Sequence, residues 1–90
     1  MPYIPQERRV ALELGDPMRE PGDLAFELWR KILDYVEKNS EERLRYRTAA
    51  EVLGVLSSLQ LEFARRFLTP LEEAAIRRNG DLEFPYPRPE

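Results

Sequence analysis

The segment RRNGD at positions 77–81 combines two cations, an amide and a carboxylate beside a glycine, a composition that can bind phosphate. Arg77 and Arg78 could hold an anion through charge-assisted hydrogen bonds. The alternative is a helix C-terminus, where arginines complement the helix dipole and Gly80 adopts a left-handed conformation. Phosphate loops use amide donors at helix N-termini, whereas a helical pattern runs into this segment from its N-terminal side. We therefore predict that RRNGD ends a helix.

Other arginines cluster in the central part of the sequence and could follow a nucleic-acid backbone. The candidate anion or nucleic-acid contacts are Arg43, Arg45, Arg47, Arg77 and Arg78. Neighbouring glutamates cancel most of this charge, and the whole chain carries a net charge of −3, whereas a nucleic-acid-binding protein usually has a basic face. A solvated, salt-bridged surface is the favoured interpretation, so nucleic acid is not the expected partner.

Acidic residues suggest a third kind of chemistry. Asp34 and Glu37 have the three-residue spacing with which helical nucleotide pyrophosphohydrolases of the MazG type hold magnesium. The other glutamate pairs of that pattern are not found, and both residues lie on the charged face of their helix. The chain has no histidine and no cysteine, which removes the usual nitrogen and sulfur zinc ligands and excludes thiol and imidazole catalysis. We predict no enzyme activity, no catalytic residue, no metal and no cofactor.

The elements that position these residues are all predicted to be helical, in a small bundle of three main helices. A short helix begins near Pro5 and is followed by the linker GDPMREPGD. The second helix is predicted from about Pro21 to Asn39, with an apolar arc of roughly 200°, about twice that of an ordinary surface helix. Its remaining positions, Asp23 among them, are expected to face solvent.

The third helix is predicted to be long. Thr48 and Glu51 have the spacing of a capping box, so we expect the helix to begin there and to run at least to Leu68. Thr69 is a second possible cap, and Pro70 either kinks this helix or starts a fourth, because proline removes a backbone donor and clashes with the preceding turn.

This third helix is apolar on two opposite sides. Val52, Leu56, Leu59, Phe63 and Phe67 line a narrow face, whereas small side chains line the opposite one. A glycine within a helix costs roughly 1 kcal/mol relative to alanine, and a common reason for it is the close approach of another backbone. That backbone could be the second helix of the same chain or another copy. We predict a homodimer in which this helix supplies the contact through a candidate seam of Ala50, Gly54, Ser57, Leu61, Phe63 and Ala64.

Ninety residues make one domain at most, which we place at 1–80, followed by a proline-rich and extended tail at 81–90. The N-terminus lacks the apolar core of a signal peptide, and no run approaches the roughly 20 apolar residues of a membrane span. These features predict a cytoplasmic protein. The excess of arginine over lysine and the scarcity of thermolabile residues are compatible with a thermophilic origin.

Three segments resemble a family of small proteins of unknown function encoded by prokaryotes and their phages. They are MPYI at 1–4, LEFARRFLTPLEE at 61–73 and NGDL at 79–82, whose counterparts in that family are a similar opening, EFYRR followed by a proline, and NGDV. Ala64 departs from the aromatic residue expected at its position. The resemblance implies a small helical protein of phage or mobile-element origin and transfers no catalytic residue. Together the observations predict a non-enzymatic, self-associating protein-interaction module with an unidentified protein partner.

Overall fold

The computed structural model describes residues 2–41, 43–83 and 86, and within them every regular element is a helix. The elements are α1 (Gln6–Glu13), α2 (Pro21–Asn39), α3 (Tyr46–Phe63), the π-helical segment η1 (Ala64–Leu68) and α4 (Thr69–Asn79). The predicted all-α class, with three main helices and a long third one, is confirmed. The chain divides into two compact units, Met1–Leu53 and Gly54–Glu90.

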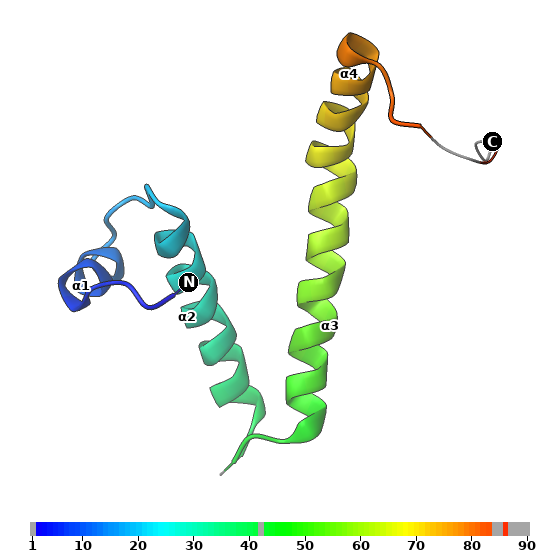
Figure 1. The fold of residues 1–90 in the computed structure, drawn as a ribbon. Coiled ribbons are helices and arrows are strands. Elements are labelled where there is room, and N and C mark those ends of the chain that lie inside the picture. The colour runs from blue at the N-terminus through cyan, green and yellow to red at the C-terminus, as the bar shows by residue number, and fades with distance from the viewer. Residues whose placement is uncertain (1, 42, 84–85, 87–90) are drawn as a thin grey trace. The chain divides into compact units, whose positions relative to one another are not determined.

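The first unit is built around α1 and α2, which pack side by side (Figure 1). Leu12 of α1 and Phe26 of α2 are its two buried apolar side chains among the described residues. Arg9 and Arg30 place their guanidinium groups over the Phe26 ring, 5.9 and 6.0 Å from its centroid, so the ring is covered partly by cations. The apolar core of this unit is therefore small.

The predicted bounds of α2 are confirmed. Pro21 occupies the first helical position, where its missing N–H costs no hydrogen bond, and Ser40 is extended and ends the helix. Much of the wide apolar arc is uncovered, since Leu24, Trp29 and Tyr35 are between 43% and 51% exposed.

The predicted start of the third helix is wrong by two residues. α3 begins at Tyr46, and the amide of Ala49 donates to the carbonyl of Arg45 at 3.2 Å. Thr48 therefore lies inside the first turn, where it is buried, and its hydroxyl donates to the carbonyl of Asn39 at 3.3 Å. The hydroxyl ties α3 to the end of α2 instead of capping its own helix.

The predicted interruption near Pro70 takes the form of a π-helical segment. The amide of Thr69 donates to the carbonyl of Ala64, five residues earlier, and the backbones of Phe63, Leu68 and Thr69 all remain right-handed helical. Pro70 has no N–H, and its ring would crowd the carbonyl of Arg66 in a regular turn, which a wider turn relieves. The helix consequently continues past the proline, and Thr69 makes no side-chain cap.

The prediction that RRNGD ends a helix is confirmed. α4 ends at Asn79, and Gly80 has a φ of 86° while its amide donates to the carbonyl of Ile76 at 2.8 Å. Residues 81–83 form neither helix nor strand, and the rest of the predicted extended tail lies outside the described residues, apart from Tyr86. No helix among the described residues is long and apolar enough to cross a membrane.

Candidate functional site

The most connected polar group of the first unit is Arg8, which joins α1 to the start of α2. Its Nε and Nη2 donate to the two oxygens of Asp23 at 3.1 and 2.7 Å, Nη2 also donates to the carbonyl of Pro17 at 2.9 Å, and Nη1 pairs with Asp16. The Asp23 carboxylate further accepts the amides of Arg19 and Glu20 at 3.0 and 3.2 Å. This guanidinium is fully engaged by its own chain, so it is not available to a ligand.

The position of Asp23 corrects the sequence prediction. It was expected on the solvent-facing side of its helix, but only 3% of its surface is exposed. The hydrogen bonds from Arg8, and then the backbone bond from Arg19, hold the pKa of Asp23 well below its ordinary range, and Asp23 in turn raises the pKa of Arg8. An acidic residue in the first turn of a helix, preceded by a helix carrying paired arginines, was the available signal.

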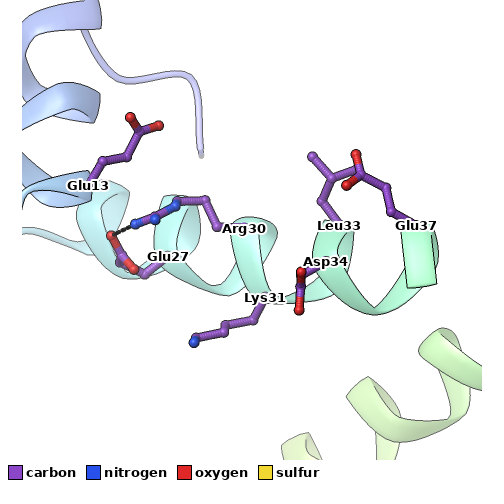
Figure 2. Close-up of a pocket in the computed structure, with 7 residues that line it drawn as sticks. All are labelled: Glu13, Glu27, Arg30, Lys31, Leu33, Asp34 and Glu37. Carbon is purple, nitrogen blue, oxygen red and sulfur yellow. Dashed lines mark hydrogen bonds and ion pairs between the residues drawn. The ribbon is translucent and has the colours of Figure 1, made fainter. Parts of the chain in front are cut away.

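The carboxylates considered for magnesium lie along an open concavity between α1 and α2. Its lining residues are Glu13, Glu27, Arg30, Lys31, Leu33, Asp34 and Glu37. Figure 2 shows the carboxylates of Asp34 and Glu37 pointing in different directions. Asp34 pairs with Lys38 at 3.1 Å, and Glu27 pairs with Arg30 at 2.9 Å. Within the described residues, no three acidic side chains converge as metal ligands would.

The candidate anion contacts are not brought together as one group. Arg45 pairs with Glu41 at 2.8 Å and Arg47 with Glu51 at 3.2 Å. Arg77 and Arg78 lie in the last turn of α4, where they complement the helix dipole. Arg43 is exposed in the connection before α3. The arrangement resembles a solvated surface more than an anion site.

A large amount of apolar surface remains uncovered on the long helix. The large apolar face consists of Val52, Leu56, Leu59, Phe63, Phe67 and Leu71; the small-residue face consists of Ala50, Gly54, Ser57, Leu61 and Ala64. On the large apolar face, the leucines and phenylalanines are between 38% and 68% exposed, and Phe63 and Phe67 contact each other with ring centroids 5.0 Å apart. On the small-residue face, Leu61 is 73% exposed.

The predicted seam is divided between these two faces. Phe63 follows Gly54 by nine residues, about two and a half turns of α-helix, so the two residues lie on opposite sides of α3. Leu61 stays near Gly54, about two turns away. Phe63 therefore lies with Phe67 on the large apolar face, whereas Gly54 and Leu61 lie on the small-residue face.

Within the first unit, the hydrogen bonds described between α2 and α3 lie on one side of α3. Thr48 reaches the carbonyl of Asn39, and Glu51 accepts a hydrogen bond from the Tyr35 hydroxyl at 2.9 Å, which raises the pKa of Tyr35. Ala50 follows Thr48 by about 200° around the helix, and it is exposed. The beginning of the small-residue face thus points away from α2.

Gly54 offers a test of close packing at the small-residue face. A Cβ atom built on Gly54 meets no other atom within 4 Å among the described residues. Replacing Gly54 with alanine is therefore expected to stabilise the helix by roughly 0.5–1 kcal/mol, measured by thermal unfolding. Gly80→Ala serves as a control that should lower the stability, because the φ of 86° at Gly80 disfavours any side chain. A loss of stability in Gly54→Ala would instead indicate that another backbone packs against this position.

Comparison with known proteins identifies a family. The family model of a domain of unknown function (DUF6899) matches residues 1–82. No curated protein and no solved structure matches the chain. A family of unknown function is what the sequence resemblance led us to expect, and the match extends from the N-terminal segment through the C-terminal cap of α4. The chain therefore belongs to the DUF6899 family.

Proposed function

We propose that this protein is a non-enzymatic, helical protein-interaction module that self-associates through the apolar surface of its long helix. The observation that carries the proposal is the exposure of the large apolar face, where Leu59, Phe63, Phe67 and Leu71 are each more than half exposed. In the described part of the unit that begins at Gly54, the end of α3, η1 and α4 follow one another as one continuous helix, and no strand is present. A single helix cannot bury these side chains against itself.

The free energy of hydrophobic burial favours covering such a surface. Burying apolar area yields roughly 25 cal/mol per Å², and monomeric proteins rarely leave a continuous apolar patch of several hundred Å² in water. A two-fold homodimer is the simplest way to cover it, since the same face then meets itself.

The proposed location of the protein is the cytoplasm. Its proposed origin is a phage or a mobile element, and this origin rests on the family resemblance described above.

The alternative proposal, nucleic-acid binding through an arginine surface, is less well supported. Arg8, Arg45, Arg47 and Arg66 each pair with a carboxylate of the same chain, which lowers the positive potential that would attract a phosphate backbone.

Self-association predicts a stability that depends on protein concentration. A ligand or partner that binds only the folded chain stabilises it by mass action, so the midpoint of thermal unfolding should rise as the concentration is raised. We expect a rise of several degrees between low-micromolar and near-millimolar protein, followed by circular dichroism. A midpoint that stays constant over this range would count against the proposed function.

A further inference from the structure

The partner that best fits the large apolar face is a second copy of the same helix running in the opposite direction. We propose an antiparallel, two-fold dimer whose axis crosses the large apolar face at the level of Ala64, with a charged edge of Glu51, Glu62, Arg66 and Arg77 beside the contact. This inference rests on the proposed self-association and adds the face, the orientation and the register.

The large apolar face continues on both sides of Ala64. Phe63, Phe67 and Leu71 are spaced by four residues twice in succession, which would carry a regular α-helical stripe gradually around the helix. A π turn closes with a bond five residues long and holds about one residue more than an α turn, and the π turn here lies at Ala64–Leu68. The π turn accommodates this extra residue, so Leu71 stays on the same side of the helix as Phe63. The small-residue face has no such continuation, because Arg65, Thr69 and Glu73 follow on its side.

The area of this face suits a stable dimer. Three leucines and two phenylalanines, each more than a third exposed, hold on the order of 500 Å² of accessible apolar surface. With the residues flanking them, this approaches the roughly 800 Å² that each partner contributes to a standard interface.

The four residues of the charged edge are spaced symmetrically about one position, with the two acidic residues before it and the two basic residues after it. Glu51 and Glu62 are eleven residues apart, about three turns, so they lie on the same side of α3. Arg66 follows Glu62 by four residues, and its Nε is hydrogen-bonded to that carboxylate, which lowers the pKa of Glu62. Arg77 follows Arg66 by eleven residues. Ala64 is therefore the midpoint both between Glu62 and Arg66 and between Glu51 and Arg77.

An antiparallel pairing about Ala64 brings opposite charges level with each other. Glu62 of one copy lies level with Arg66 of the other. Glu51, which also pairs with Arg47 and accepts from Tyr35 in its own chain, lies level with Arg77, and each pairing occurs twice by symmetry. The other charged residues of the long helix also meet no like charge. Arg65, Glu72, Glu73 and Arg78 come level with Phe63, Leu56, Val55 and Ala50, and Arg47 comes level with Asp81.

Other arrangements lose this complementarity. Moving the axis to residue 62 brings Glu62 level with Glu62, and moving it to residue 66 brings Arg66 level with Arg66. A parallel pair in register places every charge of the edge beside its own copy. Like charges at these positions disfavour an arrangement, so the edge selects one orientation and one register.

A charge-swap variant, Glu62→Arg with Arg66→Glu, tests the orientation directly. The swap keeps an oppositely charged pair four residues apart within each helix, and it keeps opposite charges across an antiparallel homodimer. A mixed antiparallel dimer with the wild type would place Arg beside Arg and Glu beside Glu. The swap leaves the chain mass unchanged, so ¹⁵N-labelled wild type is mixed with unlabelled variant at low ionic strength and examined by native mass spectrometry.

We expect both homodimers and few mixed dimers. The mixed fraction should fall from the statistical half to about a tenth of all dimers if the mixed pairing is tenfold weaker. High salt should restore mixing, since it screens exposed charges. Statistical mixing at low salt, an excess of mixed dimers as a parallel pair predicts, or a variant that alone fails to dimerise would overturn the geometry while leaving self-association in place. Monomers in every sample would overturn the proposed function itself.

A second variant separates the two faces. Gly54→Leu adds bulk on the side opposite Phe63, so it should leave the dimer intact. Dissociation of the Gly54→Leu dimer would place the contact on the small-residue face and would contradict the proposal.

Discussion

The Asp23→Asn variant is expected to unfold at a temperature lower than the wild type by on the order of 10 °C. Asparagine is nearly isosteric with aspartate, but it cannot accept at both oxygens from Arg8 and carries no charge to balance the guanidinium. Asp23 is almost fully buried and accepts the amides of Arg19 and Glu20, so the substitution also removes part of the hydrogen bonding at the start of α2.

The matched control for this substitution is Asp34→Asn. Asp34 makes the same kind of ion pair with Lys38, but its side chain is 59% exposed, and exposed pairs contribute little to stability. Its unfolding temperature should stay within about 2 °C of the wild type, because such surface changes usually fall within 0.5 kcal/mol. Equal losses in the two variants would contradict the structural role assigned to Asp23.

Lowering the pH should remove the stability that the ionised Asp23 carboxylate gives to the folded chain. Its pKa is lowered in the folded chain, so its contribution to stability is fully present above the ordinary value of 3.8 and is lost as the pH falls from there toward the folded-state pKa. The difference in unfolding temperature between wild type and Asp23→Asn should therefore be constant near neutral pH and should narrow below about pH 4. A difference that is unchanged at the lowest accessible pH would argue against the ionised Asp23–Arg8 pair.

The Phe63→Asp variant is expected to be a monomer. In the proposed dimer Phe63 lies near the centre of the contact, where a carboxylate would be desolvated without a partner, so the dissociation constant should rise by about a hundredfold or more. In the free chain this side chain is 64% exposed, and the substitution should leave the helix content by circular dichroism nearly unchanged.

Leu61→Asp provides a closely matched control. Leu61 is also a large apolar residue, 73% exposed and only two residues away, but it lies about 200° around the helix on the small-residue face. Leu61→Asp should therefore retain the dimer. Dissociation by Leu61→Asp alone would show that the dimer uses the other face, and dissociation by both would show that the contact is broader than the large apolar face.

The helices could be predicted from the sequence because their signals are local. Pro21 and the periodic apolar residues fixed the bounds of α2, and the arginines before Gly80 marked the end of α4. The start of α3 was placed too late because the helix already begins at Tyr46, with Thr48 in its first turn, where the Thr48 hydroxyl donates to an acceptor, the carbonyl of Asn39. That acceptor comes from a different helix, and a capping pattern read within one segment does not contain it.

The candidate site was predictable in part for the same reason. Helical spacing identified the apolar faces of α3, but the seam joined Gly54 to Phe63 across the helix. The burial of Asp23 depends on a contact with Arg8 fifteen residues earlier, which periodicity along α2 cannot reveal. The π turn before Pro70 also changes which residues share a face, and proline alone predicts an interruption without predicting its form.

The mass of the wild-type protein in solution, measured by sedimentation equilibrium at micromolar concentration, tests self-association most directly. The chain mass is 10.6 kDa, and the account predicts a species of twice that mass, with Phe63→Asp sedimenting at the mass of one chain in the same buffer. A wild-type protein that sediments as a single species of 10.6 kDa over the whole concentration range would contradict the account.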